Sequence, residues 1–285
     1  MLAAEHGTAY ISEPLNVWHR QGVYRIPVDH WYTYITAENE SHYLPGFDEL
    51  LRFRYHFWRE IRSLRSGRDF LRMVRDGVNF TNGRLRRLRP LIKDPFAVLS
   101  AGWFAQRLKC RVVITIRHPA GFASSLKRLG WPFEFKDLLD QPLLMRDHLK
   151  PDRARMESIQ SGDLIGQASL LWRMIYRVVH TFQTLEPAPL IVRHEDLSRD
   201  PVGEYRRLYQ SLGLVFDQKV SKVILNSSSS ENPGELSKSK VHSVKLDSRA
   251  GLDNWKRRLD LEEIRRIRKV TEEVSGLYYS DEDWN

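Results

Sequence analysis

The order of apolar and polar positions along the chain predicts short strands that alternate with helices. Apolar, β-branched runs typical of buried strands lie at residues 8–12, 90–95, 111–116 and 189–193. The pattern predicts helices over 96–108, 166–183, 201–213 and 261–274, and residues 47–90, rich in arginine and aromatic residues, also look helical. This alternation predicts an α/β fold of three layers, in which helices flank a mainly parallel sheet.

The length of 285 residues favours a single domain over residues 1–285. Met1-Leu-Ala-Ala reads as a short helix. Residues 226–248 are rich in serine and lysine, a composition that predicts a mobile loop.

Charge and cysteine content narrow the functional classes. The net charge of +9 suits a polyanionic ligand, although each basic cluster taken alone is typical of a solvated helix face. Cys110 is the only cysteine, which excludes a disulfide framework within the chain and favours a reducing, cytoplasmic setting. The sequence shows no signal-peptide pattern and no apolar run of membrane-spanning length, so we expect no transmembrane segment.

One stretch has the composition of an anion site. The apolar run at 111–116 stops at Arg117, Pro119 then opens a helical pattern, and Ser125 follows on that pattern. A guanidinium offers phosphate a planar fork of donors, and the start of a helix adds oriented N–H groups. The pattern therefore predicts that Arg117 and Ser125 bind an anion together.

Charged residues also follow the other strands. Glu13 comes after the first strand and Lys93 after the second, and ligands of parallel sheets gather at the carboxyl ends of strands. Transfer of an anionic group needs a carboxylate that accepts a proton and cations that stabilise developing charge. The alternative roles are structural: Glu13 capping a turn, Lys93 pairing with Asp94, and Arg117 pairing with Glu195. For each residue taken alone, the structural role is preferred. The placement of all three at strand ends favours a role in group transfer.

These residues resemble motifs of sulfotransferases that use 3′-phosphoadenosine-5′-phosphosulfate, above all the tyrosylprotein type and related bacterial enzymes. Arg117 and Ser125 match the pair that binds the 3′-phosphate of the donor. Lys93-Asp-Pro95 resembles the turn whose lysine touches the sulfuryl group. Arg193-His-Glu-Asp-Leu197 is similar to a family motif that has tyrosine where this chain has His194.

Further matches lie near the end of the chain. Leu236-Ser-Lys238 resembles a segment whose serine holds the sulfuryl group, and Arg249-Ala-Gly251, followed by Trp255-Lys256, resembles a motif that closes over the 3′-phosphate. The resemblance implies a fold like that of P-loop nucleoside-triphosphate hydrolases. It implies catalytic roles for Glu13 as general base, Lys93 and Ser237, and donor-binding roles for Arg117, Ser125, Lys245, Arg249 and Gly251.

The resemblance also implies the reaction partners. The donor is 3′-phosphoadenosine-5′-phosphosulfate, the acceptor carries a hydroxyl, and no metal is required. Residues 20–85 are expected to form a helical region on the acceptor side. Residues 226–248 are expected to form either a lid over the bound donor or a disordered insertion. Carbohydrate, lipid, peptide and small alcohol all remain open as acceptors.

One family feature is absent from the sequence. Family members begin with a strand and a loop similar to Gly-x-x-Arg-Ser-Gly-Thr-Thr, which holds the 5′-phosphosulfate; here Met1–Gly7 resemble the end of the helix that follows it. We therefore expect the first strand and this loop to be missing and activity to be weak. The alternatives are an inactive remnant that binds a 3′-phosphonucleotide and, less favoured, a basic nucleic-acid-binding protein. No helix-turn-helix, zinc or aromatic RNA-binding signature supports the latter.

Overall fold

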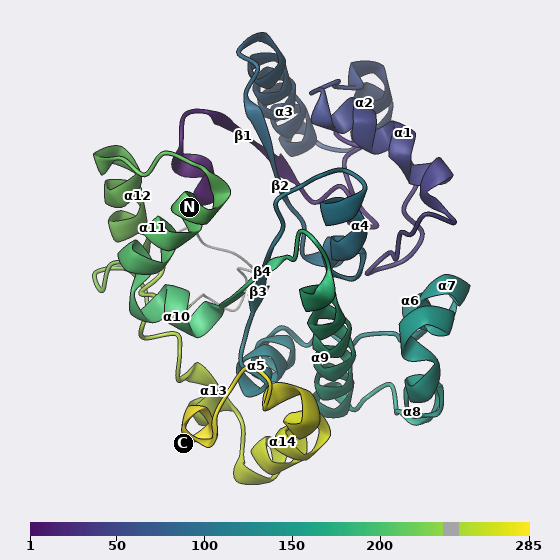
Figure 1. Ribbon diagram of the computed structural model, residues 1–285, viewed down its shortest axis with the longest axis vertical. Coiled ribbons are helices and arrows are strands. Elements are labelled where there is room, and N and C mark those ends of the chain that lie inside the picture. Colours follow the sequence, from purple (N-terminus) through teal and green to yellow (C-terminus); the bar gives the residue numbers. More distant parts are fainter. Residues whose placement is uncertain (236–244) are drawn as a thin grey trace. The chain divides into compact units, whose positions relative to one another are not determined.

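The computed structural model describes residues 1–235 and 245–285. Two compact units make up the chain (Figure 1). The N-terminal unit is Ala3–Leu108, and the C-terminal unit is Lys109–Asn285 together with Met1–Leu2. A single turn of 3-10 helix, η1 (Leu2–Ala4), begins the chain, where the sequence predicts a short helix.

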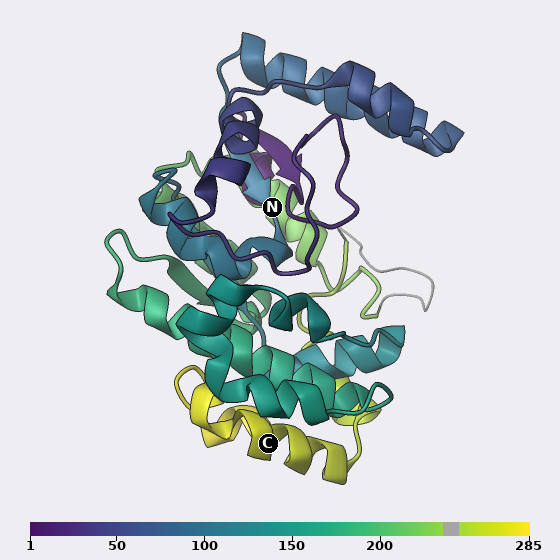
Figure 2. The same ribbon diagram turned by 90° about the vertical axis from the view of Figure 1, so that its right-hand side faces the viewer.

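The N-terminal unit contains one parallel pair of strands. β1 (Thr8–Ser12) lies beside β2 (Arg89–Lys93) in a register that places Ser12 opposite Lys93. The helices of this unit are α1 (Glu40–Leu51), α2 (Phe57–Ser63), α3 (Gly67–Leu85), η2 (Pro95–Ser100) and α4 (Ala101–Gln106). Figure 2 shows α3 as the long helix of this unit.

Residues 47–90 are helical over most of their length, as the sequence predicts, but the helical residues are divided among the end of α1, α2 and α3. Phe53, just beyond the end of α1, has a φ of 54°, a left-handed conformation that stops a helix. α3 starts anew where the Ser66 hydroxyl accepts the Asp69 N–H at 3.2 Å. Residues 96–108 are likewise divided between a 3-10 helix and a short α-helix. The spacing of apolar side chains does not reveal where the backbone leaves the α-helical conformation.

The C-terminal unit contains the second parallel pair. β3 (Val113–Ile116) lies beside β4 (Leu190–Arg193), with Ile116 opposite Arg193. Its helices are α5 (Pro119–Leu129), α6 (Lys136–Leu139), α7 (Pro142–Leu144), η3 (Met145–Leu149), η4 (Lys150–Asp152), α8 (Arg153–Ser158), α9 (Leu164–Thr181), η5 (Phe182–Thr184), α10 (His194–Arg199), α11 (Pro201–Leu212), α12 (Gln218–Ser228), α13 (Asn254–Arg258), α14 (Leu261–Ser275) and η6 (Asp281–Trp284).

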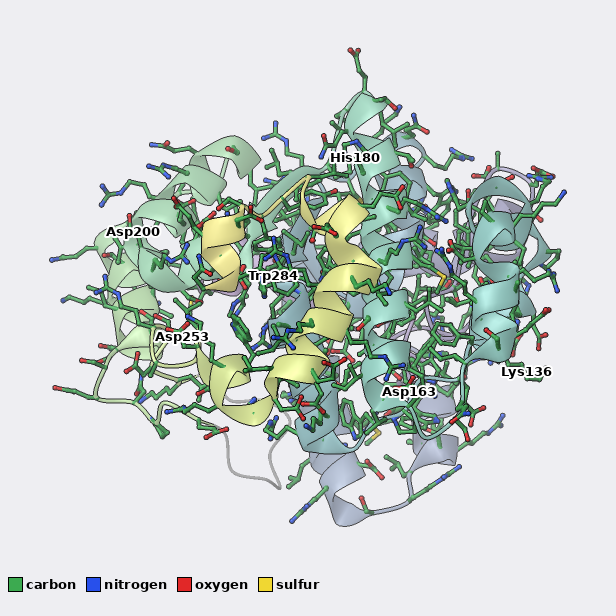
Figure 3. All side chains as sticks on the ribbon, turned by 90° about the horizontal axis from the view of Figure 1, so that it is seen from below. Lys136, Asp163, His180, Asp200, Asp253 and Trp284 are labelled. Carbon is green, nitrogen blue, oxygen red and sulfur yellow. The ribbon has the colours of Figure 1, made fainter. Side chains whose placement is uncertain are left out.

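The core of this unit forms where α5, α9, α13 and α14 meet. α9 is buried along most of its length, and Asp163 caps its first turn by accepting the Gly166 N–H at 2.9 Å. Alanines on α5 and α9 allow the helices to approach closely, and Trp255 of α13 and Ile267 of α14 belong to the same buried cluster. Figure 3 looks onto α14 and the C-terminal turn that carries Trp284.

Parallel strands flanked by helices confirm the predicted α/β class. Helices α9, α11 and α14 agree with the sequence pattern, and α11 ends at Gly213 with a φ of 62°. In the described part of the chain the strands form two separate two-stranded sheets where one sheet was expected, because hydrogen bonds join β1 only to β2 and β3 only to β4.

The predicted loop over 226–248 begins too early. Residues 226–228 form the last turn of α12, and 236–244 lie outside the described residues. As for membranes, none of the helices in the two described stretches combines the length and apolarity that a membrane span requires.

Candidate functional site

In the N-terminal unit, the two strand ends bring Glu13 and Lys93 together. Lys93 Nζ donates to Glu13 Oε1 at 2.5 Å, and the Glu13 backbone N–H donates to the Lys93 carbonyl at 2.9 Å. Asn16 Nδ2 donates to the other carboxylate oxygen, Oε2, at 2.9 Å. Lys93 therefore pairs with Glu13, and the alternative pairing with Asp94 is wrong.

Glu13 has an unusual backbone conformation. Its φ is 47°, in the left-handed region that costs a residue with a side chain roughly 1–2 kcal/mol. Such strained residues concentrate at active sites, where the surrounding structure enforces them. At Glu13 the backbone N–H is held by the Lys93 carbonyl and the carboxylate by the Lys93 ammonium.

Asp94 fixes the geometry of this strand end. Its carboxylate accepts the backbone N–H of Leu15 at 2.6 Å and that of Phe96 at 2.9 Å. Burial and, to a smaller extent, the charge of Glu13 raise the pKa of Asp94 to about 6, against the opposing effects of the two N–H groups and Lys93. Asp94 thus ties the segment after β1 to the segment after β2.

In the C-terminal unit, Arg117 and Ser125 meet as predicted from their spacing. Arg117 NH1 donates to Ser125 Oγ at 2.8 Å across the first turns of α5. Within the described residues Arg117 has no ion pair. Its pKa is lowered, first by burial and then by the nearby charge of Arg258. A desolvated guanidinium whose partner is a neutral hydroxyl retains a strong preference for an anion.

Glu195 does not form an ion pair with Arg117, so that structural alternative is wrong. Its Oε1 accepts the backbone N–H of His118, and its Oε2 accepts the hydroxyl of Tyr279, both at 2.9 Å. Glu195 acts on Arg117 through its charge, which opposes the lowering of the arginine pKa.

Gly121 leaves room for the Arg117 side chain. A Cβ atom at this position of α5 would lie 3.1 Å from Arg117 Nε, closer than ordinary packing. Glycine in a helix weakens it by about 1 kcal/mol relative to alanine. The missing side chain lets Arg117 lie close to the helix backbone.

A second guanidinium, Arg258 of α13, was not predicted from the sequence. Its NH1 lies 3.5 Å from the hydroxyl of Ser124, the neighbour of Ser125, and its NH2 forms an ion pair with Glu235. Arg258 ends the basic run Lys256-Arg-Arg258, which reads as an exposed helix face. Only the packing of α13 against α5 distinguishes Arg258, with 20% of its side chain exposed, from its neighbours.

The remaining predicted residues do not gather around Arg117 in the described contacts. The Arg249 guanidinium donates to the Arg199 carbonyl at 2.8 and 3.1 Å, and its backbone N–H donates to Asp247 at 3.0 Å. Gly251 lies in the following turn and Lys245 is exposed. Ser237 lies outside the described residues.

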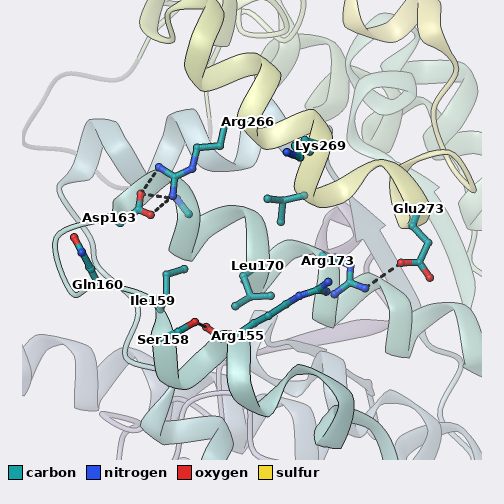
Figure 4. Close-up of a pocket in the computed structure, with 12 residues that line it drawn as sticks. Arg155, Ser158, Ile159, Gln160, Asp163, Leu170, Arg173, Arg266, Lys269 and Glu273 are labelled. Atoms are coloured by element: carbon teal, nitrogen blue, oxygen red, sulfur yellow. Dashed lines mark hydrogen bonds and ion pairs between the residues drawn. The ribbon is translucent and has the colours of Figure 1, made fainter.

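A hollow of about 770 Å³ lies elsewhere in the C-terminal unit, among α8, α9 and α14 (Figure 4). Its arginines already have acidic partners: Arg266 pairs with Asp163, and Arg173 lies 3.0 Å from Glu273. None of the predicted site residues lines this hollow. The ion-paired groups that line this hollow are therefore already neutralised by one another.

Metal-ligating side chains do not cluster in the part of the chain that the structure describes. Residues 1–235 and 245–285 contain no group of three or more histidine, cysteine, aspartate or glutamate side chains arranged to hold an ion.

Comparison with known proteins identifies the family. The family model described as "Sulfotransferase domain" matches residues 84–278, more than half of the chain, and spans parts of both units. The protein therefore belongs to the sulfotransferase domain family and is an enzyme, a sulfotransferase.

Among solved structures, the chain is similar to "Sulfotransferase Domain from the Curacin Biosynthetic Pathway", at 15% sequence identity and a TM-score of 0.41. The match covers 95% of this chain and 97% of the other. No curated protein matches the chain.

Proposed function

We propose that the protein transfers a sulfuryl group from 3′-phosphoadenosine-5′-phosphosulfate to an acceptor hydroxyl. The observation that carries the proposal is the 2.8 Å contact between Arg117 and Ser125 at the start of α5, in a chain of the sulfotransferase domain family. A fold like that of P-loop nucleotide-binding enzymes, and a cytoplasmic location in keeping with the single cysteine, belong to the same proposal.

Binding of the donor would use the guanidinium groups of Arg117, just before α5, and of Arg258 on α13. Arg117 and Ser125 would hold the ribose 3′-phosphate, and Arg258, near Ser124, would add a second charge. Two arginines suit a phosphate because each presents several donors in a fixed plane. Lys245, Arg249 and Gly251 are proposed as further donor-binding residues on the family resemblance.

The chemical step would use the strand ends of the N-terminal unit. Glu13 would accept the proton of the acceptor hydroxyl while the hydroxyl oxygen attacks the sulfur of the donor in line. The new sulfur–oxygen bond forms as the bond from sulfur to the 5′-phosphate oxygen breaks, and adenosine 3′,5′-bisphosphate leaves with the electron pair. Lys93 and Ser237 would stabilise charge on the migrating group. Lys93 also holds the Glu13 carboxylate in place.

The acceptor side would include an aromatic surface within residues 20–85 and its flanks. Trp18 is 81% exposed and meets Trp31 edge to face at 5.3 Å, and Trp31 lies 4.4 Å from Phe96. The backbone N–H of Phe96 donates to Asp94, the residue that follows Lys93. An aromatic cluster with an exposed tryptophan, joined through Phe96 to the segment that follows Lys93, suits an acceptor whose hydroxyl is carried on a ring.

The direct test is transfer of radiolabelled sulfate from 3′-phosphoadenosine-5′-[³⁵S]phosphosulfate to phenols, sugars, lipid alcohols and tyrosine peptides. We expect label on at least one hydroxyl acceptor, together with release of adenosine 3′,5′-bisphosphate. Tight binding of the bisphosphate without transfer to any acceptor would favour the inactive nucleotide-binding protein. Nucleic-acid binding that the bisphosphate does not displace would favour the nucleic-acid-binding protein.

A further inference from the structure

A single peptide group, the one between Arg117 and His118, is held from both sides by buried side chains. Its carbonyl accepts the indole Nε1–H of Trp172 at 2.8 Å, and its N–H donates to Glu195 Oε1 at 2.9 Å. Trp172 lies on α9, and Glu195 lies in the first turn of α10, directly after β4. Both hydrogen bonds constrain the same peptide plane, so they set the direction in which Arg117 leaves the strand.

Glu195 is itself held by the C-terminal segment. Its second oxygen, Oε2, accepts the hydroxyl of Tyr279 at 2.9 Å, and both residues are buried, at 8% and 5% exposure. Burial, followed by the charge of Glu195, raises the pKa of Tyr279, so its hydroxyl keeps the proton that it donates. The Tyr279 ring also lies against the His118 ring, at 5.0 Å.

We propose that Glu195 and Tyr279 are positioning residues for Arg117, and that the C-terminal segment thereby completes the binding site for the donor's 3′-phosphate. The inference rests on the proposed function, since it assigns Arg117 to that phosphate. Glu195 uses both oxygens on neutral donors and contributes its negative charge without occupying the guanidinium. Arg117 therefore keeps its donors for Ser125 and for the ligand.

The chain provides a matched control at the neighbouring tyrosine. Tyr278 donates its hydroxyl to the Tyr176 carbonyl at 3.3 Å, outside the relay from Tyr279 through Glu195 to the peptide. Tyr279→Phe and Tyr278→Phe remove the same atom from adjacent positions. The readout is the dissociation constant, measured by calorimetry on the full chain, for adenosine 3′,5′-bisphosphate and for adenosine 5′-monophosphate.

We expect Tyr279→Phe to weaken binding of the bisphosphate roughly tenfold, which corresponds to one lost hydrogen bond to a charged group. The monophosphate, which has no 3′-phosphate, should bind as it does to the wild type. Tyr278→Phe should leave both constants within about twofold. Glu195→Gln, whose amide nitrogen cannot accept a hydrogen bond, should show the same selective loss; it decides the question if Tyr279→Phe does not fold.

Two results would overturn the positioning role. One is an unchanged constant for the bisphosphate in Tyr279→Phe; the other is an equal loss for both nucleotides, which marks a general effect on the fold. A wild-type protein that does not prefer the bisphosphate over the monophosphate would instead refute the proposed function, so the two failures are distinguishable.

Discussion

Glu13 and Lys93 are joined twice, by a side-chain contact of 2.5 Å and by a backbone hydrogen bond of 2.9 Å. The parallel register of β1 and β2 brings this about, because Ser12 lies opposite Lys93 and the chain turns directly afterwards. The lysine is therefore oriented by the same residue that is proposed to accept the proton. The backbone hydrogen bond remains when the Glu13 side chain is replaced, so a substitution can remove its charge without moving the residue.

Glu13→Gln should lower kcat by roughly 10²–10⁴-fold, because the amide cannot accept the acceptor's proton. Donor affinity should change little, since the substitution preserves side-chain size and the backbone contact to Lys93. Steady-state kinetics and donor-binding calorimetry separate the two quantities. Collapse of donor affinity with kcat preserved would make Glu13 a binding residue.

Gly121→Ala should weaken binding of adenosine 3′,5′-bisphosphate without lowering the melting temperature. The new Cβ would lie 3.1 Å from Arg117 Nε and would displace the guanidinium. Alanine itself favours the helix by about 1 kcal/mol. Gly77→Ala on α3 is the matched control, because its Cβ would meet Tyr55 at an ordinary 3.7 Å. Equal affinities in the two variants would show that Arg117 needs no space at Gly121.

Arg258→Ala should reduce affinity for the bisphosphate roughly tenfold if the second guanidinium contacts the phosphate. Arg257→Ala, at the preceding position of α13, should leave affinity within about twofold. Glu235→Gln should raise affinity, because it removes the carboxylate that now pairs with Arg258. Calorimetry at two salt concentrations measures the affinity of all three variants for the bisphosphate. Equal affinities of Arg257→Ala and Arg258→Ala would show that both arginines belong to the solvated surface.

His118 should make the protein less stable in mild acid. The residue is 3% exposed among Trp255, Tyr279 and Trp284, and within the described residues neither ring nitrogen has a hydrogen-bond partner. Burial above all lowers the pKa of His118 to about 3, well below the ordinary histidine value of about 6.5. The unfolded state therefore takes up a proton between pH 7.5 and 5 that the folded state refuses, and the free energy of unfolding falls as the pH falls.

This contribution amounts to about 2 kcal/mol between pH 7.5 and 5. His118→Phe keeps the ring and removes the titration, so its loss of stability over that range should be smaller than the wild-type loss by about this amount. Urea unfolding at the two pH values measures the difference, with exposed His42→Phe as the control. An identical pH dependence in wild type and His118→Phe would show that the imidazole titrates normally.

Local sequence patterns predicted the parts of the molecule that local chemistry determines. The β-branched run at 113–116 forms a strand, and Pro119 starts the helix that follows it. Arg117 and Ser125 were predictable because they are eight residues apart on adjoining elements. The same holds for Glu13 and Lys93, whose proximity follows from parallel strand ends.

Residues whose role depends on packing between distant elements were not predictable. Arg258 lies in a run of basic residues and is distinguished only because α13 packs against α5. The sequence suggests Glu195 as an ion-pair partner of Arg117, whereas in the structure the two oxygens of Glu195 accept hydrogen bonds from His118 and Tyr279. The left-handed φ values at Glu13 and Phe53 have no signature in residue type, since neither is glycine or asparagine.

The central claim is that Arg117 binds the 3′-phosphate of the donor, and thermal stabilisation by adenosine 3′,5′-bisphosphate tests it most directly. Arg111→Ala is the matched control, because the exposed Arg111 guanidinium contacts only the Ser211 carbonyl, at 3.0 Å, in the described hydrogen bonds. We predict that the bisphosphate raises the melting temperature of the wild type and of Arg111→Ala, and that Arg117→Ala loses this stabilisation. Stabilisation of Arg117→Ala equal to that of the wild type would contradict the claim.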